Sequence, residues 1–345
     1  MKKSSGIVIF ILLALAALAL YVYRSRGRMD TASDDSRNFS YKDTASITSI
    51  FIADKEGNRS LIKRTAKGWI VNDKYLCRGD AILNLLEAIR NVEVQYPVPK
   101  EAQENVIKFL ASGALKVEIY AGGELVKQYY IGHETPDSQG SYMLLTDPES
   151  GKNYREAYAC FIPGFVGYLQ PRYIAKETEW RDRLVLNYIP PQMKQVKVEH
   201  LDLPRDSSFT IDLLTTSNFV LKNGNGKQIQ FDEARLKQYL IYFQNISYEG
   251  LITGKNKKLQ DSLSLQLPFC VLSVTTTGFR TDVFKMYRKK VRPDVTFDQG
   301  VVYDYDPDRF YLNFDDGREW AVAQYYVFGK LLVTPEYFGD ESVKK

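Results

Sequence analysis

An uncharged apolar run near the N-terminus constrains this chain most, because a run of that length suits a lipid bilayer. Residues 6–23 read GIVIFILLALAALALYVY and contain no charged side chain. As an α-helix they would extend about 27 Å, close to the roughly 30 Å thickness of a bilayer core. Tyr21 and Tyr23 close the run, where aromatic rings favour the membrane–water interface. The run therefore predicts a transmembrane anchor, preceded by a short tail of residues 1–5.

A cleaved signal peptide is the alternative for this run, but such a peptide would end at a site with small residues. Here the run continues into Arg24-Ser25-Arg26, and no Cys follows it to accept a lipid. The sequence therefore favours an uncleaved anchor. Basic residues lie on both sides of the run, so they do not decide its orientation. Residues 24–44 are polar and are expected to form a flexible tether between the anchor and the folded part.

The charge of the folded part is close to zero. The chain has 46 Lys and Arg residues against 42 Asp and Glu residues, and five of the basic residues flank the apolar run. Without those five the balance is about −1, so no nucleic-acid partner is expected. The five flanking basic residues are Lys2, Lys3, Arg24, Arg26 and Arg28.

The remaining chain repeats one order of elements at an offset of about 150 residues. Alternating apolar positions and turn residues predict three short strands in each half, and a helix after them. We expect Asp80 to cap the first helix, over residues 81–92, and Asp232 to cap the second. The expected strands are 47–52, 61–62 and 68–72 in the first half, and 196–198, 209–213 and 218–221 in the second.

Further strands and a closing helix are expected in each half. The strands are 115–119, 129–131 and 142–145, and then 270–274, 283–287 and 310–314. The apolar segments 158–169 and 320–332 are interpreted as helices. The predicted fold class is therefore α+β, with an N-terminal transmembrane helix followed by two similar units, 45–188 and 189–345. Each unit is expected to be a mostly antiparallel sheet with helices packed on one face.

The segment Gly68-Trp69-Ile70-Val71-Asn72, with the helix that carries Leu83, Leu86 and Ile89, resembles a bacterial family called domain of unknown function 4340. The resemblance implies a single-pass anchored protein with a repeated β-rich unit. It also implies an extracytoplasmic location, and some relatives are auxiliary to gliding-motility-type ABC transporters. In that pattern Trp69 and Asn72 are packing and turn positions, and the resemblance implies no catalytic residue in this chain.

No motif of nucleotide, metal or hydrolase chemistry occurs in the chain. His133 and His200, the only histidines, are each interpreted as exposed at a strand end. Asp304, Asp306 and Asp308 alternate as in a calcium loop, but Gly and Glu are missing at the positions that such a loop requires. We therefore expect neither an enzyme nor a cofactor or metal.

Two segments are candidate interaction sites, because Trp, Tyr and Arg dominate interaction hot spots. One joins the two halves, and its residues could equally clamp the two units together. The other is the basic segment 285–292, for which a solvated strand end is the favoured alternative because Asp294, Asp298 and Asp304 lie nearby. The candidate residues are Trp180, Arg181, Arg183, Tyr287, Arg288 and Lys289.

The three cysteines, Cys77, Cys160 and Cys270, are far apart in the sequence and are interpreted as buried small hydrophobic residues. A Cys77–Cys160 disulfide remains an alternative in an oxidising compartment.

Together these features predict a non-enzymatic protein of the bacterial inner membrane with its bulk on the periplasmic side. Its expected partners are the lipid bilayer and another envelope or transporter subunit. The alternative is an anchored ligand-binding module for glycans, which would use some of the 24 tyrosines in a cleft between the halves.

Overall fold

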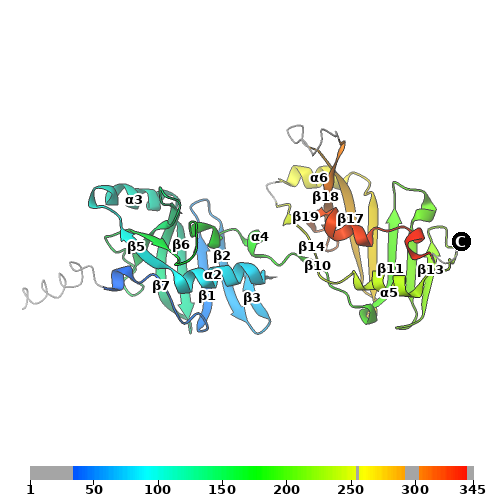
Figure 1. Ribbon diagram of the computed structural model, residues 1–345, viewed down its shortest axis with the longest axis horizontal. Helices are drawn as coiled ribbons and strands as arrows, with labels where there is room; N and C mark the ends of the chain where they lie inside the picture. The colour runs from blue at the N-terminus through cyan, green and yellow to red at the C-terminus, as the bar shows by residue number, and fades with distance from the viewer. Residues whose placement is uncertain (1–33, 254–255, 292–302, 340–345) are drawn as a thin grey trace, which may run out of the picture. The chain divides into compact units, whose positions relative to one another are not determined.

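The computed structural model describes residues 34–253, 256–291 and 303–339. They fold as two compact units that divide between Asp182 and Arg183 (Figure 1). Both units are mostly antiparallel sheet with a few helices, so the predicted α+β class is confirmed. The sequence had placed the division six residues later, after residue 188.

The first unit contains a nine-stranded sheet in the order β4-β3-β2-β1-β6-β7-β8-β9-β5, with antiparallel neighbours throughout. Its strands are β1 (Ile47–Ala53), β2 (Arg59–Thr65), β3 (Gly68–Val71), β4 (Tyr75–Leu76), β5 (Glu93–Pro97), β6 (Leu115–Ala121), β7 (Glu124–Glu134), β8 (Ser141–Thr146) and β9 (Tyr158–Phe161).

The second unit contains an eight-stranded antiparallel sheet in the order β13-β12-β11-β16-β17-β18-β19-β15. A separate ribbon pairs β10 (Leu184–Leu186) with β14 (Ile246–Ser247). The sheet strands are β11 (Met193–His200), β12 (Phe209–Leu213), β13 (Phe219–Asn223), β15 (Gly250–Leu251), β16 (Cys270–Thr276), β17 (Thr281–Lys290), β18 (Tyr305–Phe314) and β19 (Glu319–Gln324).

The strand order of the second sheet repeats that of the first, once β3 is matched with β13 and β5 with β15. The likeness extends to register. The pairing of β1 with β6 shifts between Ile47 and Ser49, and the pairing of β11 with β16 shifts between Met193 and Gln195. A shared strand order and a shared irregularity make each residue of one sheet comparable with a position in the other.

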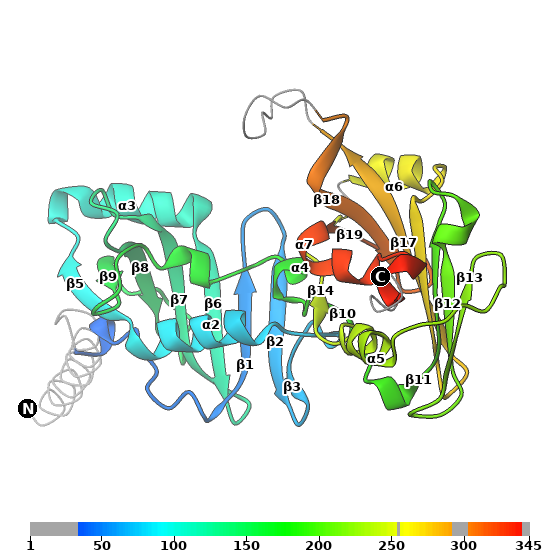
Figure 2. The ribbon, with the colours of Figure 1, turned by 45° about the vertical axis from the view of Figure 1, so that its right-hand side comes forward.

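Helices lie on both faces of each sheet, so the prediction of helices on one face is wrong. Consecutive side chains of a strand point to opposite faces. In the first sheet Met143 packs in the core that contains α2, whereas Tyr142 packs against the core of α3. In the second sheet Met286 and Tyr287 divide in the same way between α5 and α6. Figure 2 shows α2 lying across the first sheet.

The helices and helical turns have the following bounds. The α-helices are α2 (Gly79–Asn91), α3 (Lys100–Gly113), α4 (Glu177–Trp180), α5 (Glu233–Ile241), α6 (Lys257–Ser264) and α7 (Tyr325–Phe328). The 3₁₀ turns are η1 (Asp34–Arg37), η2 (Gln170–Arg172), η3 (Pro190–Gln192), η4 (Arg205–Ser207), η7 (Gly329–Leu331) and η8 (Pro335–Phe338).

The first closing helix predicted from the sequence is wrong, because Tyr158 begins β9 rather than a helix over 158–169. The second, over 320–332, is correct only in its C-terminal part: Trp320 lies in β19, whereas α7 and η7 make residues 325–331 helical. Both strands lie inside a sheet that is covered on both faces, so neighbouring residues are buried whichever way they point. Such a strand gives an unbroken apolar run that periodicity cannot distinguish from a buried helix.

One of the two predicted helix caps is confirmed. The Asp232 carboxylate accepts the backbone N–H of Arg235 at 3.0 Å and so caps α5. Asp80 instead lies inside the first turn of α2, whose N-cap is Arg78 without a side-chain bond. The hydrogen bond from the Arg78 guanidinium holds the pKa of the Asp80 carboxyl below its usual value.

The first unit begins before residue 45. Phe39 is buried, with its ring 6.3 Å from that of Tyr129 and 6.0 Å from that of Tyr158. The backbone N–H of Tyr41 donates to the carbonyl of Ile89 at 2.9 Å. Residues 34–44, which the sequence assigned to the tether, are therefore packed on the first unit.

The predicted anchor over residues 6–23 lies outside the described residues. Within the described ranges, no helix combines the length and apolar character needed to cross a bilayer.

All three cysteines belong to the described part of the chain, and each is a buried free thiol. The interpretation of these residues as buried small hydrophobic side chains is confirmed, and the alternative Cys77–Cys160 disulfide is not formed.

Candidate interaction site

The three candidate residues at the junction do not share an exposed surface. Trp180 is fully buried in the first core, where its indole N–H donates to the carbonyl of Ile174 at 2.7 Å. The Arg181 guanidinium lies 3.6 Å from the centre of the Tyr75 ring. Arg183 contributes its carbonyl to the N–H of Tyr248 at 3.0 Å. Trp180 is therefore a core residue of the first unit rather than a contact residue for a partner.

The other three candidates are consecutive on β17, and alternation sends them to different surroundings. Tyr287 is buried against α6, with its ring 5.1 Å from that of Trp320. Arg288 is exposed at the end of the strand. Lys289 forms an ion pair with Asp306 of β18. Arg288 is thus the candidate whose functional group is most open to a partner.

Arg288 is held in place from several sides. Its guanidinium forms an ion pair with Asp202, which follows β11. The same group lies 5.1 Å from the ring centre of Phe269 and 5.5 Å from that of Tyr305. The hydrogen bond to Asp202 raises the pKa of Arg288 above its usual value, so the charge is permanent. A cation fixed in this way loses little conformational entropy when it binds a partner.

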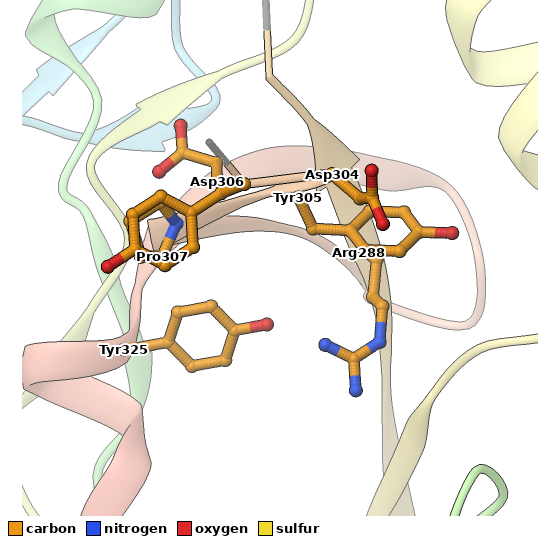
Figure 3. A pocket seen from close by; sticks show the side chains of 7 residues that line it. Arg288, Asp304, Tyr305, Asp306, Pro307 and Tyr325 are labelled. Carbon is orange, nitrogen blue, oxygen red and sulfur yellow. The ribbon is translucent and has the colours of Figure 1, made fainter. Parts of the chain in front are cut away.

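Beside Arg288 the surface is hollowed. This Arg288 hollow has a volume of about 470 Å³ and is formed by the end of β17, the start of β18 and α7. Figure 3 shows Arg288 and Tyr325 pointing into the same open space. Burial raises the pKa of the Tyr325 phenol, so it stays a neutral hydrogen-bonding group. The lining residues are Arg288, Tyr303, Asp304, Tyr305, Asp306, Pro307 and Tyr325.

Asp306 is one of the residues that line the Arg288 hollow, and it holds the first part of β18 in place. Its carboxylate accepts the backbone N–H groups of Asp308 and Arg309, each at 3.0 Å, as well as the Lys289 ammonium. Burial acts to raise the pKa of Asp306, but these hydrogen bonds outweigh it and the pKa is lowered. Asp306 therefore acts as an internal tie of β18.

The described residues contain no metal-binding arrangement. No group of three His, Cys, Asp or Glu side chains there could hold a metal ion. His133 is exposed, as predicted, and its ring lies 5.4 Å from that of Phe109. His200 was expected to be exposed, but it is buried, and a ring nitrogen lies 3.0 Å from the carbonyl oxygen of Val333.

The first unit has a hollow of its own, between α3 and the β7–β8 hairpin. It measures about 550 Å³ and contains no Arg or Lys. Its lining residues are Asn105, Val106, Phe109, Glu134, Thr135, Pro136 and Tyr142. Without a fixed cation or a cluster of tyrosines, this hollow is a weaker candidate than the Arg288 hollow.

Most partners of Arg288 could not be found from the sequence. Asp202 follows β11, far from β17 in the chain, and Phe269 directly precedes β16; strand pairing brings both to Arg288. The closely spaced Tyr303 and Tyr305 were the one available signal, because they alternate with Asp304 and Asp306 in the sequence.

Searches with this chain found no matching family model, no matching curated protein and no matching solved structure.

Proposed function

We propose that this chain is a non-enzymatic, membrane-anchored protein of the cell envelope that binds another subunit of a membrane complex through the Arg288 hollow. The observation that carries the proposal is the placement of Arg288, paired with Asp202 and lying near Phe269 and Tyr305 at the edge of an open hollow. Arg and Tyr are the residues most enriched at the energetic centres of protein interfaces.

The surroundings of Arg288 support a protein partner. The guanidinium is already oriented before binding, so its remaining N–H groups can meet carbonyl or carboxylate oxygens of the partner at low entropic cost. Tyr303 and Tyr305 are partly open at the same place, and each offers a large rigid ring with a polar hydroxyl. An open, aromatic and polar surface of this kind favours contact with a partner over enclosure of a small substrate.

The membrane part of the proposal rests on the apolar run of residues 6–23. An uncleaved helix there would hold both units at the membrane surface. The resemblance to domain of unknown function 4340 supports a periplasmic location and a transporter or other envelope subunit as the partner.

The test is a pull-down of the full-length chain from its native membranes in mild detergent. Arg288→Ala is expected to reduce the recovered partner by at least about tenfold, because truncating a hot-spot residue costs about 2 kcal/mol or more. The matched control is Arg280→Ala, because Arg280 is likewise an exposed arginine ion-paired with an aspartate, here Asp282, but it precedes β17 and so lies at the end of that strand opposite to Arg288. Equal recovery of the same partner with both variants would refute the Arg288 hollow as the binding site.

A glycan ligand is the second candidate, and the three tyrosines of the Arg288 hollow favour it. Sugar rings present apolar C–H faces that stack on aromatic rings, and hydroxyl edges that bond to Asp and Arg. Arg288 and Asp306 are each paired with an opposite charge, which suits a neutral ligand. Glycan-array binding that is lost in Tyr305→Ala but kept in Arg280→Ala would support this candidate, and an array without any binding would count against it.

A further inference from the structure

Four exposed leucines gather at one end of the second sheet. Leu201 and Leu203 follow β11, and Leu265 and Leu267 lie between α6 and β16. Their exposed fractions range from 46% for Leu203 to 89% for Leu265. Leu265 and Leu267 are therefore almost as exposed as in an extended chain, although leucine is among the residues most often buried.

The two segments that carry these leucines are neighbours. The last residue of β11, His200, pairs with the first residue of β16, Cys270. Just beyond that pair, the N–H of Leu201 donates to the carbonyl of Phe269 at 2.8 Å. We call residues 201–203 and 265–267 the leucine loops. Because strand pairing fixes the start of one loop beside the end of the other, both loops lie at the same end of the sheet.

The fold itself does not require the leucine loops. In the first unit the turn that corresponds to residues 201–203 joins β1 to β2 and contains Asp54, Lys55 and Glu56. There α3 leads into β6 through Ala114 alone, whereas in the second unit five residues, 265–269, lie between α6 and β16. Two sheets with the same strand order therefore differ at this end, and among the described residues only the second unit presents protruding leucines at this end of its sheet.

The chemistry of this end fits a lipid surface. Residues 262–269 read SLSLQLPF and carry no charge, so burying them in an apolar medium removes no ion from water. In residues 201–203 the single charge, on Asp202, is already paired with Arg288. Tyr303, Tyr305 and Tyr326 are exposed at the same end of the sheet. Leucines and tyrosines exposed at one end of a sheet match the composition of a bilayer interface, where apolar side chains enter the acyl boundary and amphipathic rings lie at the level of the headgroups.

We propose that the leucine loops insert into the surface of the membrane in which the chain is anchored. This inference rests on the anchor of the proposed function. Residues 24–33 connect the apolar run to the first described residue, and ten residues reach at most about 33–36 Å. The bilayer is therefore present at high effective concentration for both units. A fluid bilayer adapts to two protruding tips, whereas a protein partner would need a pocket for each.

The test measures the depth of single positions in the full-length chain reconstituted into phosphatidylcholine vesicles. Leu265→Cys and Leu267→Cys are labelled with an environment-sensitive fluorophore, and nitroxide groups on the lipid chains act as quenchers. Leu214→Cys is the matched control, because Leu214 is exposed in the β12–β13 turn at the opposite end of the same sheet. The three native thiols are buried, and burial raises the pKa of Cys77 and of Cys270 to about 12, so they react slowly.

The expected result is a fluorescence loss of about twofold or more at positions 265 and 267 and little change at 214, since interfacial segments sit about 5–10 Å deep. Vesicles that carry the chain but show equal quenching at all three positions would overturn the inference and leave the anchor intact. A chain that does not float with vesicles would overturn both. Shielding at 265 and 267 that appears only with native membrane proteins would assign the leucine loops to a protein partner instead.

Discussion

Replacing Phe39 with Ala should destabilise the first unit by several kcal/mol, although the sequence places this residue in a polar tether. The Phe39 side chain is about 1% exposed and makes edge-to-face contacts with Tyr129 and Tyr158. Truncating a buried Phe to Ala costs about 3–5 kcal/mol, from lost apolar burial and the cavity that remains. The geometry of the aromatic contacts accounts for about 0.5–1.5 kcal/mol for each pair.

The assay must report the first unit alone, because the two units can unfold separately. Trp69 and Trp180 belong to the first unit and Trp320 to the second. In a Trp320→Phe background, tryptophan fluorescence during urea unfolding therefore follows the first unit. With a urea slope of about 2 kcal/mol per molar, a loss of about 4 kcal/mol lowers the midpoint by about 2 M.

The control for Phe39→Ala is Leu83→Ala, because Leu83 is exposed on α2 and its truncation should cost less than about 0.5 kcal/mol. A midpoint for Phe39→Ala that matches the control would refute the packing of residues 34–44 on the first unit. The same packing predicts that a soluble form beginning at Ser40 is much less stable than one beginning at Asp34.

Two further predictions concern the second unit, and Trp320 fluorescence reports both in a Trp69→Phe, Trp180→Phe background. Asp232→Ala should cost about 1 kcal/mol through loss of the α5 cap. Its counterpart Asp80→Ala lies in the first unit, is followed in the Trp320→Phe background, and should cost less than about 0.5 kcal/mol because Asp80 is not the cap of α2; equal costs would contradict the assignment. Asp306→Asn should cost about 1–3 kcal/mol at pH 7, because it weakens charge-assisted bonds to Lys289 and two amides. Folding lowers the pKa of Asp306, so its contribution to stability is full above about pH 4 and is lost as the pH falls through the lowered value. The difference in the free energy of unfolding between wild type and Asp306→Asn should therefore shrink in acid. A difference that stays constant down to about pH 2 would be inconsistent with this linkage.

The elements that could be predicted are those with one buried face. In α2, Ile82, Leu85 and Ile89 face the core at helical spacing, and in β1 Ile50 and Ile52 alternate with less buried residues. Periodicity identifies such elements because the opposite face is polar. The missed helix α3 buries only Leu110, so its sequence lacks a clear apolar stripe.

The candidate site was predictable only in part, for a topological reason. Arg288 was found because it lies in a basic segment of the sequence. Asp202 and Tyr325 meet it only after β11, β16, β17, β18 and β19 have paired, and no local pattern encodes those pairings. Trp180 was misleading because its hot-spot composition is equally that of a core residue, and burial decided between the two.

The most direct test of the Arg288 hollow is photo-crosslinking in living cells, with a photoreactive phenylalanine analogue placed at Tyr305 in the full-length chain. The control position is Phe279, which is also exposed but lies in the β16–β17 turn at the other end of the same sheet. The proposed function predicts a discrete crosslinked membrane protein at position 305 that is absent at position 279. The same products at both positions, or no protein product at position 305, would contradict it.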